Sequence, residues 1–407
     1  MEFASSTHRR LWLFTEAQLL EIRQKNREAS LAAIKQAKEA SQEDTPAVLG
    51  EGEAGKQLGK QKKARAVTLE EEAALLKFYQ IKMQGLCRAL GFPTKVQAAA
   101  LMFLKRFYLA FSVLDHDPKN YMLTCIYLAG KVEEAYIGAE EFCARVRQEE
   151  AVVLRAEPAL LQALRFDLIT FSPYRALNGF LMDLEVCCGE AGAGGLEPSL
   201  APLGGEPDNV ARLRGAAAAA VDALMLTDAP LLFPPGQLAL AGLRSGVRKL
   251  GAALGTYLER VARRAAPDGG TSNGSAAASL VALKAQSNGG LGGPGSEGAP
   301  DGAAGRLAQL QAALLRIDAL GALGAAPVDD EAVRRIDRRL KACHNPLLDP
   351  SSAAFRADEA AREQAAAAAR HRKVAMRQAA AAAKLAALLG AEPPPPAFPM
   401  RPPDAPG

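Results

Sequence analysis

The stretch from residue 67 to about residue 188 contains few glycines, and its apolar side chains recur with the 3.6-residue period of an α-helix. This pattern predicts five helices within the stretch. The first is expected to begin at Thr68, in a capping box with Glu71. The third is expected to begin at Pro118 with Asp117 as its N-cap. The fifth is expected to run through residues 160–170. A chain built around such a block is predicted to be all-α.

Further helices are predicted on both sides of this block. Residues 12–40 are expected to form one helix with Thr15 as its N-cap. Others are expected at about 174–188, 208–227, 235–250, 251–264, 306–323 and 330–344. An apolar pair, a short turn, a proline and an apolar helix occur twice, at Val113-Leu114 and again at Leu231-Leu232. This faint duplication predicts two tandem five-helix repeats.

Composition shifts divide the chain into predicted domains. Two segments at about 189–206 and 265–305 are rich in glycine and are expected to be disordered inserts, because they cannot bury enough apolar surface. The proline-rich C-terminal end is expected to be an extended spacer. The predicted domains are an N-terminal helix and linker at 1–66, a first repeat at 67–172, a second repeat at 173–327, a C-terminal helix at 328–345 and an Ala/Pro-rich tail at 346–407.

Charge and residue spacing exclude several classes of protein. The formal net charge of the 407 residues is only +4, so a strongly basic nucleic-acid binder is not expected. No run of about 18 apolar residues occurs, and the first residues lack the apolar core of a signal peptide. The six cysteines show no CxxC spacing, which favours structural thiols in a reduced, intracellular chain. The four histidines are scattered, so neither a metal nor a cofactor is expected.

Three short motifs suggest chemistry that their context does not support. Residues 50–56 fit GxxxxGK, but Gln57 stands where a phosphate-binding loop needs Ser or Thr. Residues 115–117 (Asp-His-Asp) form either an acid–base cluster or a turn, and the turn is favoured because no nucleophile is nearby. The basic clusters at 60–65 and 370–373 fit nuclear import, nucleic-acid binding or plain solvated charge. No catalytic residue is therefore predicted.

Lys131 and Glu157 are better candidates for a functional site. Lys131 ends the most apolar helix of the block, where its cation complements the helix C-terminus. Glu157 precedes Pro158 in an amphipathic segment, where a carboxylate favours exposed backbone N–H groups. Composition alone leaves both a surface role and a binding role open for each residue.

Several segments together resemble the cyclin family. LAGKVEEA at 128–135, LLQALRFDLI at 160–169 and SPYRALNGFLMDL at 172–184 resemble the cyclin box, most closely that of the H type. The similarity extends to residues 5–15, 103–125, 223–240 and 338–344. It implies two five-helix repeats flanked by N- and C-terminal helices, in a regulatory subunit that is not itself an enzyme.

The resemblance also implies a kinase-binding face on the first repeat. Lys131 matches the cyclin lysine that bonds to backbone carbonyls of the kinase, and Glu157 matches the glutamate that accepts backbone N–H bonds. The apolar positions that pack on the regulatory helix of the kinase match Leu128, Val132, Leu161 and Phe166. Pro158 departs from the family pattern and is expected to kink or restart its helix. The helix that opens the first repeat lacks an MRxxLW substrate-docking patch, so substrate recruitment there is not expected.

A cyclin of this type is expected to activate a cyclin-dependent kinase within a CDK-activating kinase complex. That complex would phosphorylate activation loops of other kinases and, within general transcription factor IIH, the C-terminal domain of RNA polymerase II. Its other expected partners are an assembly-factor subunit and the factor IIH core, in the nucleus, with no direct nucleic-acid or membrane partner. The alternatives are a transcriptional cyclin of the C, K, L or T type with a different kinase, or a transcription factor IIB-like DNA-binding core.

Overall fold

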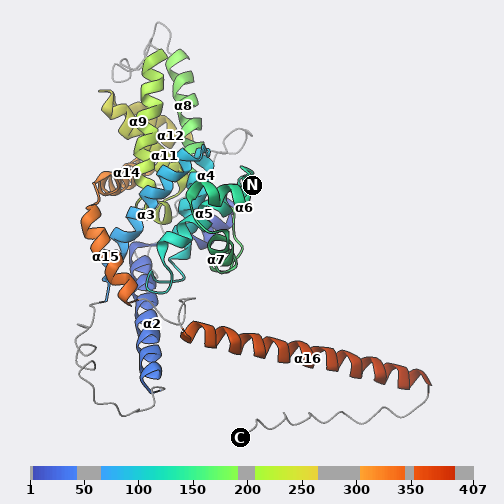
Figure 1. The fold of residues 1–407 in the computed structure, drawn as a ribbon. Coiled ribbons are helices and arrows are strands. Elements are labelled where there is room, and N and C mark those ends of the chain that lie inside the picture. Colours follow the sequence, from blue (N-terminus) through green and yellow to red (C-terminus); the bar gives the residue numbers. More distant parts are fainter. Residues whose placement is uncertain (1–2, 44–65, 191–206, 265–302, 344–352, 390–407) are drawn as a thin grey trace, which may run out of the picture. The chain divides into compact units, whose positions relative to one another are not determined.

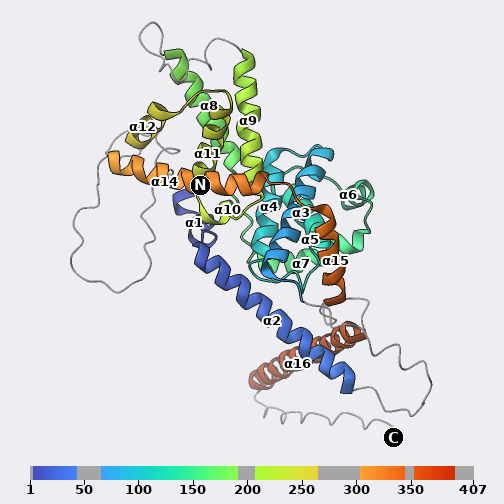
Figure 2. The ribbon, with the colours of Figure 1, turned by 90° about the vertical axis from the view of Figure 1, so that its left-hand side faces the viewer.

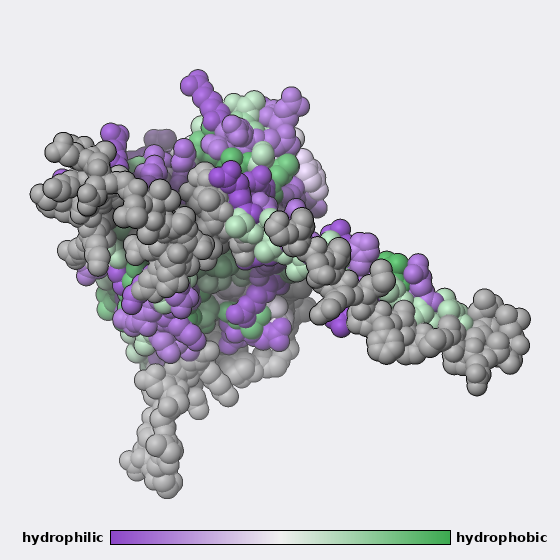
Figure 3. Space-filling model, turned by 60° about the horizontal axis from the view of Figure 1, so that its bottom comes forward, coloured by the Kyte–Doolittle hydropathy of each residue, from purple (hydrophilic) through white to green (hydrophobic). Residues whose placement is uncertain are grey.

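The computed structural model describes residues 3–43, 66–190, 207–264, 303–343 and 353–389. Every regular element in these ranges is a helix (Figure 1). The chain forms two compact units, one of residues 1–32 and 51–343, the other of residues 33–50 and 344–407. Among the coloured residues of the face shown in Figure 3, hydrophilic ones predominate, with smaller apolar areas between them. None of the helices in the described ranges is long and apolar enough to cross a membrane.

The first repeat contains five helices, of which the third is the central one. They are α3 (Leu69–Ala89), α4 (Thr94–Phe107), α5 (Pro118–Val132), α6 (Ala139–Val146) and α7 (Glu150–Ala163). Helix α5 packs against α3, α4 and α7, and most of its side chains are buried. The predicted capping box of Thr68 and Glu71 is present at the start of α3. Asp117 caps α5 as predicted, accepting a hydrogen bond of 2.9 Å from the Lys119 N–H.

The second repeat has the same plan. Its helices are α8 (Pro173–Glu190), α9 (Pro207–Met225), α11 (Pro235–Lys249), α12 (Gly255–Arg264) and α14 (Ala303–Ala325), with the short α10 (Ala229–Leu232) between α9 and α11. Helix α11 packs against α8, α9 and α14, as α5 packs against its neighbours in the first repeat (Figure 2). Both central helices begin at the proline of the duplicated motif. The prediction of two tandem all-α repeats is confirmed.

Helices also flank the repeats. A 3₁₀ turn (Phe3–Ser5), α1 (Thr7–Leu11) and α2 (Glu16–Glu43) precede the first repeat, and α15 (Asp330–Cys343) follows the second and packs on α3. Thr15 caps α2 as predicted, because the Gln18 N–H donates to its Oγ1 at 3.2 Å. The helix predicted from residue 12 begins only at Glu16, and α1 is too short to show a helical period in the sequence.

One prediction about an element end is wrong. The fifth helix of the first repeat stops at Ala163 instead of continuing to residue 170, because the following residues turn out of the helix. The segment predicted as an Ala/Pro-rich tail at 346–407 contains a long helix, α16 (Ala353–Leu389), for which the sequence analysis made no prediction. The predicted inserts at 189–206 and 265–305 and the proline-rich end lie almost wholly outside the described residues.

Polar contacts join the second repeat to the first. The carboxylate of Asp222 in α9 accepts hydrogen bonds from Gln97 Nε2 at 2.9 Å and from Arg88 Nη2 at 3.3 Å, and it also accepts one from the Tyr174 hydroxyl. Gln84 Nε2 donates to the backbone oxygen of Asp222 at 2.9 Å. Arg88, Gln84 and Gln97 belong to α3 and α4, so one aspartate links both repeats.

Gly246 lies where α11 crosses α9, and this gives a prediction about stability. A Cβ added at Gly246 would lie 2.9 Å from the backbone nitrogen of Ala217, which cannot rotate away. We expect Gly246→Ala to lower the free energy of unfolding by about 1–3 kcal/mol in denaturant titrations. A Cβ at Gly215 in α9 meets nothing within 4 Å, so Gly215→Ala should raise it by about 0.5–1 kcal/mol. Equal effects of the two substitutions would contradict the close crossing.

Glu72 in α3 is a buried carboxyl group between α2 and the turn before α5. It is 8% exposed, and its Oε1 lies 3.5 Å from Nε of Arg27. Ser112 Oγ donates to its carboxylate at 3.4 Å. The pKa of Glu72 is raised to about 7: burial raises it most and the nearby Asp115 also raises it, while Arg27 and Ser112 lower it.

This raised pKa predicts how the stability depends on pH. Above a pH of about 4.5 the unfolded chain has released the Glu72 proton, while the folded chain still binds it. The free energy of unfolding therefore falls as the pH rises from about 4.5 to about 7. The free energy of unfolding falls by at most about 1.4 kcal/mol per pH unit through this one group. We therefore expect the stability of the wild type relative to Glu72→Gln to be lower at pH 7 than at pH 5, measured by urea unfolding. The same difference at both pH values would rule out the raised pKa.

Candidate functional site

Lys131 and Glu157 lie on two helices that pack together. Lys131 is in the last turn of α5 and Glu157 is in α7. Nζ of Lys131 forms an ion pair with Oε1 of Glu157 and lies 4.7 Å from the centre of the Tyr127 ring. The side chain of Lys131 remains 37% exposed and that of Glu157 16%. The structure thus brings the two predicted residues together as one partly exposed pair.

Helix α7 continues through Pro158. The helix runs from Glu150 to Ala163 with the proline inside it, so the restart considered for this position does not occur. Leu154, Glu157 and Leu161 are separated by three and four residues and therefore share one face of α7. Leu154 is 38% exposed on that face. The sequence analysis did not select Leu154, although its spacing from Glu157 and Leu161 is the signal that identifies it.

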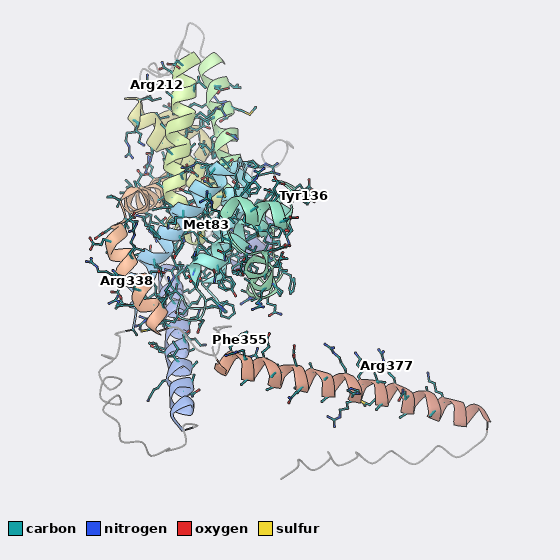
Figure 4. The ribbon with its side chains drawn as sticks, viewed as in Figure 1. Met83, Tyr136, Arg212, Arg338, Phe355 and Arg377 are labelled. Carbon is teal, nitrogen blue, oxygen red and sulfur yellow. The ribbon has the colours of Figure 1, made fainter. Side chains whose placement is uncertain are left out.

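The predicted apolar positions differ widely in exposure. Phe166 is 69% exposed, while Val132 and Leu161 are half-buried. Leu128 is only 3% exposed because it packs inside the repeat, so it offers almost no surface to a partner. Tyr136, in the loop after α5, is 78% exposed and projects from the first repeat (Figure 4). On α7 and the turn that follows it, accessible apolar surface is therefore supplied by Phe166, Leu154 and Leu161.

Phe166 is presented by a strained turn at the end of α7. Arg165 and Phe166 both have left-handed backbone angles, with φ of 53° and 56°. A left-handed residue with a Cβ costs about 1–2 kcal/mol. The Phe166 N–H donates to the Leu161 carbonyl at 3.0 Å, which closes the helix end. Such strain persists only where surrounding contacts hold it in place.

Contacts from the N-terminal segment hold this turn. The carboxylate of Asp167, next to Phe166, accepts hydrogen bonds from Trp12 Nε1 at 2.7 Å and from Thr7 Oγ1 at 2.9 Å. Nη1 of Arg106 donates to the backbone oxygen of Asp167 at 2.9 Å, and the guanidinium lies 4.6 Å from the centre of the Trp12 ring. Arg106 is fully buried, and burial lowers its pKa to about 10 against the attraction of Asp167. The sequence analysis missed this group, for which the only signal is the chain's single tryptophan.

The polar groups beside this turn are not arranged for proton transfer. His8 is 2% exposed, and its Nδ1 accepts a hydrogen bond from the Phe171 N–H at 3.1 Å. The pKa of His8 is lowered to about 3, because burial and the nearby Arg106 lower it more than Asp167 raises it, so the ring is neutral at physiological pH. The Asp-His-Asp segment at 115–117 is the turn before α5, as interpreted.

Metal ligands and reactive thiols show no cluster in the described part of the chain. No group of three or more His, Cys, Asp or Glu side chains there is placed to hold a metal ion. Burial raises the pKa of Cys87 to about 12, so this thiol is unreactive at neutral pH. The GxxxxGK segment at 50–56 lies outside the described residues.

Comparison with known proteins identifies the class to which this fold belongs. A model of the cyclin N-terminal domain matches residues 58–169, and a model of the cyclin C-terminal domain matches residues 172–286. Cyclin-H1-1 of Arabidopsis thaliana is 38% identical over 264 residues, which cover 64% of this chain and 75% of that protein. The chain therefore belongs to the cyclin family, a family of regulatory proteins.

Relatives of the H type narrow the assignment within that family. Cyclin mcs2 of Schizosaccharomyces pombe is 34% identical over 45% of this chain and 55% of its own length. Cyclin-H of Xenopus laevis is 34% identical over 46% of this chain and 56% of its own length. A chain in the structure of the CAK complex from Chaetomium thermophilum has the same fold, with a TM-score of 0.58 at 20% identity over 89% of this chain and 94% of that one.

Proposed function

We propose that this chain is the regulatory subunit of a CDK-activating kinase and binds and activates a cyclin-dependent kinase through its first repeat. The similarity to H-type cyclins supports the choice of partner. The observation that carries the proposal is the partly exposed Lys131–Glu157 pair, together with the exposed side chain of Phe166 just after the end of α7, the helix that carries Glu157. A charged pair next to an apolar anchor both orients a partner and buries surface against it.

The pair can change partners when a kinase docks. In the free chain each charge neutralises the other, so neither is left unpaired. On docking, the Lys131 ammonium is free to donate to backbone carbonyls of the kinase, and the Glu157 carboxylate to accept from its backbone N–H groups. Phe166, Leu154 and Leu161 then bury apolar surface against the regulatory helix of the kinase.

Activation follows from differential binding. An active kinase needs its regulatory helix in the position that forms the catalytic Lys–Glu pair. A cyclin that prefers this position by about 5.5 kcal/mol shifts the kinase from about 1:99 to 99:1 in favour of the active state. The chain itself contributes no catalytic group to this reaction.

The finer assignment concerns the complex and its substrates. The active kinase phosphorylates activation loops of other cyclin-dependent kinases and, within general transcription factor IIH, the C-terminal domain of RNA polymerase II. An assembly-factor subunit and the factor IIH core complete the set of partners, and the complex acts in the nucleus. These assignments rest on the H-type relatives.

Reconstitution tests the proposal. Purified chain is mixed with an inactive kinase subunit of the CDK-activating type, and phosphorylation of an activation-loop substrate is measured. We expect activation by the wild type and a clear loss with Lys131→Ala. No complex and no activation would refute the assignment of the kinase.

A charge-swapped variant separates docking from internal stability. Lys131→Glu combined with Glu157→Lys keeps an ion pair within the chain but reverses the positions of donor and acceptor. We expect this double variant to fold, with the unfolding midpoint near that of the wild type, and to fail to activate the kinase. Full activation by the swapped chain would mean that the pair serves only the fold.

A further inference from the structure

Helix α16 is a long helix whose described side chains are almost all exposed. Among its residues whose burial is described, every side chain except that of Phe355 is exposed. About half of residues 353–389 are alanine, and the segment contains neither glycine nor proline. Alanine has the highest helix propensity, so a helix of this length forms from local interactions. Its 37 residues span about 55 Å.

The charges of α16 are unevenly distributed. Its three carboxylates, Asp358, Glu359 and Glu363, precede residue 364, and no acidic residue follows them in the helix. The second part carries five cations. Four of them form a row, which we call the basic stripe: Arg370, Lys373, Arg377 and Lys384; the fifth, Arg372, points to another side of the helix.

The four residues of the basic stripe lie on one side of α16. They are separated by three, four and seven residues, which places them within an arc of about 60° around the helix. Arg377 projects from the helix in Figure 4. All four side chains are exposed, and none forms an ion pair with a residue in the described ranges. The stripe is about 21 Å long, and its charge is not neutralised by the described part of the chain.

We propose that α16 binds a nucleic-acid duplex, with the basic stripe contacting the phosphate backbone. The phosphates of a duplex offer a linear array of negative charge that matches a linear row of cations. The alanines beside the stripe are small, so the helix can approach the backbone closely or enter a major groove about 12 Å wide.

The apolar residues of α16 argue against other partners. A helix that binds a membrane surface or a protein groove needs large apolar side chains on one face. Val374 and Met376 are two residues apart and point to nearly opposite sides of the helix. Within residues 370–384, the length of the basic stripe, no apolar stripe accompanies it, because Leu385, Leu388 and Leu389 follow the stripe; electrostatic attraction to phosphates is therefore the interaction that this part of the helix offers.

This proposal revises the expectation that nucleic acid is not a direct partner. The net charge of +4 averages over the whole chain and hides the local excess in α16. The helix also lies outside both cyclin domain matches, at 58–169 and 172–286. Loss of nucleic-acid binding is therefore separable from loss of kinase activation.

Fluorescence anisotropy of the full chain with a labelled DNA duplex tests the proposal. Four phosphate contacts predict that log K falls with log salt concentration with a slope of about −3.6. Replacing all four stripe residues with glutamine, which keeps helix propensity, should weaken binding at least tenfold at about 50 mM salt and reduce the slope to near zero. Far-UV circular dichroism checks that the helix is retained.

The matched control removes the same number of charges from another exposed helix. Its four substitutions to glutamine are in α15, at Arg334, Arg335, Arg338 and Lys341, all of them exposed. We expect this variant to bind DNA within about twofold of the wild type and both variants to activate the kinase normally. An equal loss of DNA affinity in the two variants would show that binding depends on the net charge of the chain and not on the basic stripe, and would overturn the proposal. No DNA binding by the wild type, or equally tight binding to phosphatidylserine vesicles, would overturn the proposal.

Discussion

Replacing Phe166 with alanine is expected to weaken kinase binding about 30-fold while leaving the free energy of unfolding nearly unchanged. Phe166 is 69% exposed in the free chain, so its ring contributes little to the packing of the repeat. Against a partner the same ring would be fully buried, and a central aromatic anchor contributes about 2 kcal/mol or more. A loss of about 2 kcal/mol corresponds to a factor of about 30 in Kd. Titration calorimetry with the kinase subunit measures this change in Kd.

A matched control is available in the second repeat. Met182 in α8 is 64% exposed, so Met182→Ala removes a similarly exposed apolar side chain from a different surface. We expect Kd for the kinase to be unchanged in Met182→Ala. The Kd of Phe166→Leu should lie between those of Phe166→Ala and the wild type. Equal weakening by Met182→Ala and Phe166→Ala would show that Phe166 is not the anchor.

The fold was largely predictable because its helices carry local signals. The caps at Thr15, Thr68 and Asp117 and the prolines that open α5 and α11 are each encoded within a few residues. The short α1 has no period to detect. Helix α16 was missed because an alanine-rich segment shows no apolar face, although its helix propensity is high.

The candidate site was only partly predictable, because most of its contacts are distant in sequence. The resemblance selected Lys131 and Glu157, but their pairing depends on how α5 packs on α7. It also selected Leu128, whose burial follows from the packing of the whole repeat. Trp12 and Asp167 are separated by 155 residues, so no local pattern indicates their hydrogen bond.

Asp167→Ala is expected to lower the free energy of unfolding by about 3 kcal/mol and also to weaken kinase binding. The substitution removes the acceptor of the hydrogen bonds from Trp12 Nε1 and Thr7 Oγ1. It also removes the carboxylate that, among the described residues, stabilises the buried charge of Arg106. Leaving a buried cation without its counter-charge costs about 3–5 kcal/mol. Because Asp167 is partly exposed, we expect the loss of free energy of unfolding to lie at the lower end of this range. Urea unfolding measures the loss.

A double-mutant cycle separates the two causes of this loss. If the unpaired guanidinium dominates, Arg106→Met combined with Asp167→Ala should be less destabilising than the sum of the single substitutions. Simple additivity would instead assign the cost to the lost hydrogen bonds. Because Asp167 also holds the left-handed turn at Phe166, kinase binding should remain weakened in the double variant. Recovery of full binding there would mean that Phe166 keeps its position without the N-terminal segment.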